Sequence, residues 1–86
     1  MIKGVTKQGF RFTLTEDRLD NYELFELFAE IDTNPLVLPK VAQLLLGDKQ
    51  YGILKNRCKN ESGYISNKKM FAEIEQILLA SQKVKN

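Results

Sequence analysis

The chain has 86 residues, of which 43% are hydrophobic and 28% are charged, and its formal net charge is +2. This is the composition of an ordinary globular domain and excludes a disordered chain. A domain of this length hides only about 60–65% of the surface that its unfolded chain exposes, so it holds one modest core and leaves little room for a catalytic cleft. The sequence therefore predicts a single domain over residues 1–86.

The inventory of reactive side chains excludes the commonest catalytic and metal sites. The chain has no histidine and one cysteine, Cys58, so it cannot build a Ser-His or Cys-His nucleophile pair or a zinc site of the usual ligands. We interpret Cys58 as a small buried apolar group. The glycines are scattered and form no phosphate-binding loop. We expect no enzyme activity, no metal and no cofactor.

Membrane and export signals are also missing from the sequence pattern. The longest apolar runs, at residues 36–38 and 44–46, are far shorter than the roughly 20 residues of a membrane-spanning helix. Residues 1–4 carry no apolar stretch of the kind found in signal peptides. We therefore expect a protein that does not associate with membranes.

Residues 2–14 predict a β-hairpin. Phe10, Phe12 and Leu14 alternate with polar residues, and Gly9 supplies a turn just before them. Because two strands alone are marginally stable in water, the face that carries these three apolar side chains must pack on the helices that follow. We expect the hairpin to cover the core as a lid.

The first predicted helix covers residues 20–32. Asp20 is its expected cap, with Glu23 as the partner in a capping box. Apolar residues then recur at helical spacing and predict a wide buried stripe, formed by Tyr22, Leu24, Phe25, Leu27, Phe28 and Ile31. Glu23, Glu26 and Glu30 occupy the opposite face at spacings of three and four residues. This helix is therefore expected to have one buried face and one acidic face.

A second helix is predicted over residues 35–46. Asn34 and Pro35 give the favoured start of a polar cap followed by proline, and Gly47 gives the end. Pro39 is expected to kink this helix or to delay its start, because it lacks a backbone donor. The side chains expected to be buried are Leu38, Val41, Leu44 and Leu45.

Two further helices complete the predicted fold. Asp48 is the expected cap of a helix over residues 48–59, whose narrow apolar stripe consists of Tyr51, Leu54 and Cys58. Ser66 is the expected cap of a helix over residues 66–81, whose buried face consists of Met70, Phe71, Ile74, Ile77 and Leu78. Residues 82–86 are predicted to be a frayed tail. The expected fold is α+β and mostly α, with a short N-terminal hairpin packed on a compact bundle of about four short helices.

Charge is distributed unevenly along the chain. Residues 16–32 hold seven acids and one base, a net charge of −6, so the remainder carries +8. These charges would suit an ordinary solvated surface. They would equally suit docking of the acidic face on the basic side of a second copy or a partner, and head-to-tail contacts of that kind build rings or filaments. The candidate contact residues are Glu23, Glu26 and Glu30, the basic residues Lys55, Arg57 and Lys59, and the apolar residues Val37 and Leu79, which lie off the predicted stripes.

The sequence also allows a function of another class, that of a small helical DNA-binding regulator of the helix-turn-helix type. Its recognition face would be formed by the basic residues of the predicted third helix, Lys49, Lys55, Arg57 and Lys59. However, that helix carries Tyr51, Gly52 and Ile53 at positions where side chains that read base edges are needed. The acidic first helix would also repel a phosphate backbone. The pattern therefore disfavours a nucleic-acid partner.

The order of the predicted elements resembles a known family. The pieces that carry the resemblance are Gly-Phe-x-Phe at residues 9–12, Leu-Asp-Asn-Tyr-Glu-Leu-Phe-Glu-Leu at 19–27, Asn-Pro-Leu-Val-Leu-Pro-Lys-Val at 34–41 and Leu-Leu-Leu-Gly-Asp-Lys-Gln-Tyr at 44–51. In this order and spacing they look like the small tail assembly chaperones of long-tailed bacteriophages, or prophages, of Gram-positive bacteria. The resemblance covers about residues 9–80 and depends on order and spacing, since no single piece is a chemical fingerprint.

The resemblance implies a chaperone without enzymatic activity. Such a protein coats the tape-measure protein, keeps it soluble and is displaced as tail-tube subunits polymerise, so its implied partners are those two proteins and further copies of itself. Its implied location is the cytoplasm of the bacterial host, and it is absent from the mature virion. Such families also tend to produce a longer form by programmed frameshifting. A third class of function remains open, which comprises other phage structural or connector proteins and inhibitors of a host protein.

Overall fold

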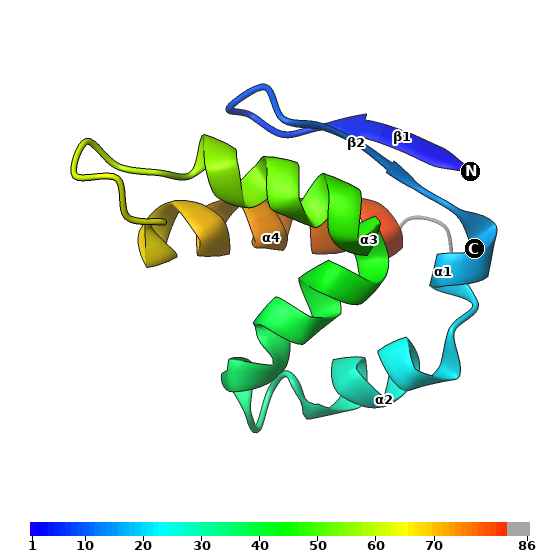
Figure 1. The fold of residues 1–86 in the computed structure, drawn as a ribbon. Coiled ribbons are helices and arrows are strands. Elements are labelled where there is room, and N and C mark those ends of the chain that lie inside the picture. Colours follow the sequence, from blue (N-terminus) through cyan, green and yellow to red (C-terminus); the bar gives the residue numbers. More distant parts are fainter. Residues whose placement is uncertain (83–86) are drawn as a thin grey trace.

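The computed structural model describes residues 1–82 and confirms an α+β fold that is mostly helical (Figure 1). The elements in chain order are β1 (Ile2–Val5), β2 (Arg11–Leu14), α1 (Glu16–Leu19), α2 (Tyr22–Glu30), the 3-10 turn η1 (Pro35–Val37), α3 (Leu38–Arg57) and α4 (Asn67–Gln82). Figure 1 shows the hairpin and α4 both lying along the second half of α3, and β1 also contacts α4. Helix α2 packs against α3 at the opposite end of the molecule. The predicted frayed tail, apart from Gln82, lies outside the described residues.

The N-terminal hairpin covers the core as predicted. Its strands are antiparallel, with Ile2 opposite Leu14. Gly9 has a φ of 95° in the connecting turn, a backbone conformation that glycine adopts at little cost. Phe10, Phe12 and Leu14 are buried in the main hydrophobic cluster. The hairpin therefore obtains its stability from contact with the helices.

The region before α2 differs from the prediction. Thr15 accepts a hydrogen bond from the Arg18 backbone N–H at 3.2 Å and so begins the separate short helix α1, which the sequence did not predict. Asp20, the predicted cap of the next helix, instead ends α1. Asn21 caps α2 by accepting a hydrogen bond from the backbone N–H of Glu23 at 3.0 Å. The predicted helix over residues 20–32 is therefore shorter, because an earlier cap shifts the boundary.

The buried stripe of α2 is narrower than predicted. Leu24 is buried, and half-buried side chains pack beside it: Leu27, Phe28 and Ile31. Tyr22 and Phe25 are 70% and 57% exposed, so the prediction that they are buried is wrong. Helix α2 packs mainly on α3, and a helix with one partner buries only one side.

Helix α3 bends at Gly47, the residue predicted to end a helix. Gly47 has φ 80° and ψ 163°, a combination that is essentially restricted to glycine. The predicted helices over residues 35–46 and 48–59 therefore appear as the two halves of one bent element. Pro39 lies in the first turn of α3, where no intrahelical donor is lost, and the start of α3 is delayed to Leu38. Asn34 caps the short turn η1 instead.

Helix α4 closes the core beneath α3. Ser66 caps it as predicted by accepting a hydrogen bond from the Lys69 backbone N–H at 3.2 Å. Phe71 is 47% exposed, which contradicts its predicted place in the core. The buried hydrophobic cluster consists of Phe10, Phe12, Leu14, Leu24, Val41, Ala42, Leu45, Leu46, Leu54, Cys58, Met70, Ile74 and Ile77.

Candidate functional site

The three glutamates predicted as contact residues lie together on the surface of α2. Glu23, Glu26 and Glu30 are exposed and line a hollow of about 250 Å³ between α2 and α3, with Lys40 on its α3 side. Three carboxylates with one nearby base produce a negative surface potential, which attracts a basic partner. We call the face formed by these three glutamates the acidic face.

An exposed aromatic pair lies on the same helix. The rings of Tyr22 and Phe25 have their centroids 5.9 Å apart. Tyr22 also borders a hollow that Asp17 and Asp20 line. Exposed aromatic side chains are enriched at protein contact sites, and here two carboxylates and one guanidinium group, that of Arg18, share the hollow beside Tyr22. Helical periodicity placed both residues in the core, so the sequence did not reveal this pair.

The predicted basic residues do not form one patch. The Lys55 ammonium lies 4.9 Å from the centre of the Tyr51 ring, an intramolecular cation–π contact. Arg57 donates a hydrogen bond to the backbone oxygen of Gln8 at 2.9 Å and so fixes the hairpin turn. Lys59 is exposed and forms a β-bridge with Ile65. Two of the three predicted bases therefore already have partners within the chain.

The two predicted apolar contact residues have different environments. Val37 is half-buried and packs against the core, so it offers little surface to a partner. Leu79 is 57% exposed on α4. Of the pair, only Leu79 is available for contact.

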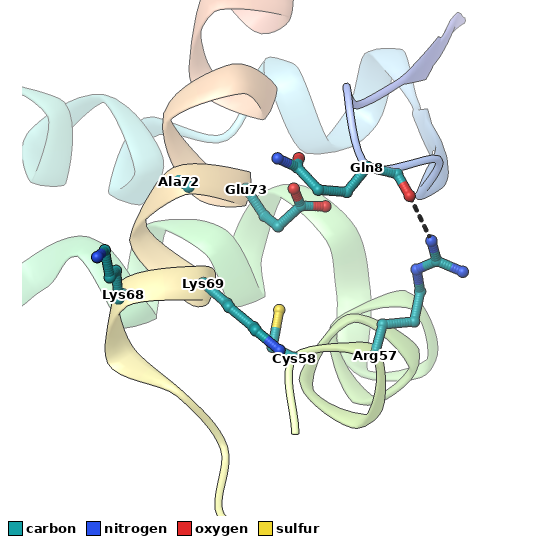
Figure 2. Close-up of a pocket in the computed structure, with 7 residues that line it drawn as sticks. All are labelled: Gln8, Arg57, Cys58, Lys68, Lys69, Ala72 and Glu73. Atoms are coloured by element: carbon teal, nitrogen blue, oxygen red, sulfur yellow. Dashed lines mark hydrogen bonds between the residues drawn. The ribbon is translucent and has the colours of Figure 1, made fainter. Parts of the chain in front are cut away.

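A pocket of about 560 Å³ lies between the hairpin turn, the end of α3 and the first half of α4 (Figure 2). We call it the hairpin pocket; its lining residues are Gln8, Arg57, Cys58, Lys68, Lys69, Ala72 and Glu73. In Figure 2 the Cys58 thiol and the Glu73 carboxylate point into the same space. Arg57 therefore joins Lys68 and Lys69, for which the sequence pattern indicated no role, around a shared cavity.

Glu73 is a buried carboxylate with one partner. Only 4% of the residue is exposed, and its Oε1 accepts a hydrogen bond from the Thr6 hydroxyl at 2.8 Å. Its Oε2 is buried and has no hydrogen-bond partner among residues 1–82. A buried polar oxygen without a partner is costly, so this atom favours an incoming hydrogen-bond donor. One signal was available in the sequence, since Glu73 falls at helical spacing between Met70 and Ile77.

Cys58 is buried beside Glu73, which confirms the interpretation of a small buried group. Burial raises the pKa of the Cys58 thiol, and the Glu73 carboxylate raises it further. Lys69 and Arg57 act in the opposite direction and lower that pKa. The net effect is a raised pKa, so the thiolate is disfavoured in the folded chain.

Cys58 is therefore expected to resist thiol reagents. At pH 8 we expect the folded chain to react with Ellman's reagent about tenfold or more slowly than the unfolded chain, because both burial and the raised pKa reduce the accessible thiolate. The absorbance of the released thionitrobenzoate measures both rates. Equal rates in the folded and unfolded chains would contradict the burial of Cys58.

Residues 1–82 offer neither a cluster of metal ligands nor a helix suited to span a membrane. Between residues 1 and 82 no three His, Cys, Asp or Glu side chains are grouped so that they could hold a metal ion. No helix in the same part of the chain combines the length and the apolar character that crossing a membrane requires. Comparisons of the chain with protein-family models, with curated proteins and with solved structures found no match.

Proposed function

We propose that the chain is a non-enzymatic protein-binding domain that acts as a tail assembly chaperone. In this role it coats the tape-measure protein of a long-tailed phage, keeps it soluble in the host cytoplasm and helps to recruit tail-tube subunits. The observation that supports the proposal most strongly is the exposed Tyr22–Phe25 pair on α2, beside the acidic face. Large exposed aromatic side chains grouped on one helix are typical of a protein contact site.

The chemistry of α2 suits a long helical client. A client helix presents an apolar stripe that aggregates when it is uncovered, and aromatic side chains cover such a stripe with little loss of conformational entropy. The acidic face next to the pair keeps the free chaperone soluble and favours clients that have basic flanks. Many copies along one client then add modest affinities, so no single contact has to be strong.

Coexpression with a tape-measure protein tests this role. We expect the wild-type chain to increase the soluble fraction of the client severalfold, and Phe25→Ser to lose most of that increase, because it removes an exposed apolar ring from the proposed contact site. Phe71→Ser is the matched control, since Phe71 is also an exposed phenylalanine on a helix but lies on α4. Equal solubility with both variants would argue against a client site on α2.

The acidic face is expected to promote contact between copies. Glu26→Lys combined with Glu30→Lys should raise the dissociation constant of self-association about tenfold and leave the helical circular dichroism unchanged, because both side chains are exposed. Sedimentation velocity at low ionic strength measures the association, and added salt should weaken it in the wild-type chain.

A second double variant separates the effect of where the charges lie from the effect of the net charge of the chain. Glu61→Lys combined with Glu75→Lys changes the net charge by the same amount, at exposed sites outside α2. We expect this variant to associate like the wild-type chain. An equal loss of association in both double variants would mean that net charge, and not the acidic face, controls the contact.

A further inference from the structure

The hairpin pocket and the exposed Tyr22 are chemically complementary. We propose that the hairpin pocket of one copy receives the Tyr22 side chain of a second copy, whose phenolic O–H donates a hydrogen bond to Glu73 Oε2. This contact rests on the proposed function, because a coat along a client needs neighbouring copies that touch. It adds to that function the surfaces through which the copies would meet. Within a row of copies it gives Tyr22 to the neighbouring copy and leaves Phe25 as the aromatic side chain that contacts the client.

The pocket restricts what can occupy it. Glu73 Oε2 lacks a partner among the described residues, so a suitable occupant carries a hydrogen-bond donor. The surrounding Arg57, Lys68 and Lys69 outnumber the single carboxylate and repel a cationic donor such as an ammonium group. The occupant that fits is therefore a neutral donor with negative charges close beside it.

Tyr22 meets these requirements. Its side chain is exposed and combines an apolar ring with a neutral O–H donor. Asp17 and Asp20 border the same hollow as Tyr22, and Glu23 follows it in the chain, so these acids outnumber Arg18, the one base in the lining of that hollow. When the ring enters the pocket, these carboxylates approach Lys68 and Lys69 on the opposing copy. Because Oε2 is itself buried in the free chain, the lining of the pocket has to open slightly to admit the hydroxyl.

The other two tyrosines fit less well. Tyr51 is only half exposed and its ring already lies beneath the Lys55 ammonium. Tyr64 is exposed, but it lies in the loop between α3 and α4, where Glu61 is the one nearby acid in the sequence. Tyr64 therefore lacks the cluster of carboxylates that accompanies Tyr22 and serves as a control.

The two surfaces lie on different parts of the molecule. The hairpin pocket is formed by the hairpin turn, the end of α3 and the start of α4, whereas α2 packs against α3 at the opposite end (Figure 1). A contact between two different surfaces is heterologous, so each copy can engage one neighbour at each end. Such head-to-tail addition produces a row of copies, which is the arrangement that a coat along an extended client requires.

Complementation between two variants tests the contact. Tyr22→Ser removes the inserted ring but keeps the pocket, whereas the double variant Lys68→Glu and Lys69→Glu reverses charge at the pocket but keeps Tyr22. Both lysines are exposed in the first turn of α4, where acidic residues are well tolerated, so this variant should fold. We expect each variant alone to be monomeric in sedimentation velocity, while an equimolar mixture forms dimers and no larger species.

The mixture stops at the dimer because the two surfaces that remain free are both disabled. One copy has no Tyr22 to insert, and the other has a pocket with reversed charge. The wild-type chain should instead form larger species as its concentration rises. Tyr22→Phe should raise the dissociation constant about tenfold, because it removes only the donor to Glu73, and Tyr64→Phe should leave that constant unchanged. Circular dichroism checks that every variant remains folded.

Three results would overturn the proposed contact: a wild-type chain that is monomeric at all concentrations, a Tyr22→Ser variant that associates normally, or a mixture that stays monomeric. The client solubility measured with Phe25→Ser is a separate readout. A chain that solubilises the client without self-association would retain the proposed chaperone function and reject the contact between Tyr22 and the hairpin pocket.

Discussion

Phe10→Ala is expected to lower the free energy of unfolding by about 3–5 kcal/mol, the usual cost of truncating a fully buried phenylalanine. Phe10 is 2% exposed at the start of the returning arm of the hairpin, and its ring stacks on that of Phe12 with the centroids 6.1 Å apart. Small domains have a total stability of about 5–15 kcal/mol, so this loss would leave the variant close to unfolding. Urea denaturation followed by helical circular dichroism measures the change.

Phe25→Ala is the matched control for this prediction. It removes the same ring from an exposed position on α2, so we expect a change within about 0.5 kcal/mol. A similar large loss in both variants would mean that α2 is buried more deeply than the structure indicates. A small loss in both would mean that the hairpin does not cover the core.

Gly47→Ala is expected to lower the free energy of unfolding by about 2 kcal/mol, because its backbone conformation is strained for any residue with a Cβ atom. The added methyl group would also meet the Arg18 guanidinium, which lies against Gly47 at the bend of α3. Chemical denaturation of the variant and the wild-type chain gives the difference.

Gly52→Ala, on the same helix, is expected to have the opposite effect on the free energy of unfolding. A Cβ atom at Gly52 meets no atom within 4 Å, and the residue lies in regular helix, so alanine should stabilise the chain by about 1 kcal/mol. If Gly47→Ala stabilised the chain as much as Gly52→Ala, the bend at Gly47 would not depend on glycine.

Local signals predicted much of this fold. The alternation of Phe10, Phe12 and Leu14, the break at Gly47 and the cap at Ser66 each depend on a few neighbouring residues. The error at the start of α2 is also local. Asp20 and Asn21 are both good caps. Because Thr15 begins α1 and Asp20 ends it, Asn21 is the residue that caps α2.

Tertiary packing explains what periodicity could not predict. Phe25 and Phe71 have helical spacings that suit burial, but which side of a helix is covered depends on its neighbours. Helical spacing indicates that Glu73 lies near the buried side of α4. It does not identify the hydrogen-bond partner of the Glu73 carboxylate, the hydroxyl of Thr6, which is 67 residues away in the sequence.

Of the two candidate sites, one could be predicted from local sequence and the other could not. The acidic face could be predicted, because Glu23, Glu26 and Glu30 lie on one helix and their spacing fixes their common side. The hairpin pocket could not be predicted, because Arg57 and Lys68 come together only through the turn between α3 and α4. Which residues share one side of a single helix is therefore easier to predict than which residues meet in a pocket formed by several elements.

Light scattering on a size-exclusion column is the most direct test of the proposed chaperone function. The purified chain would be measured at low and at high salt, with and without helical tape-measure fragments of two lengths. We predict soluble complexes in which many copies cover one fragment, with more copies on the longer fragment and fewer at high salt. A chain that remains monomeric at both salt concentrations and leaves both fragments unbound would contradict the proposed function.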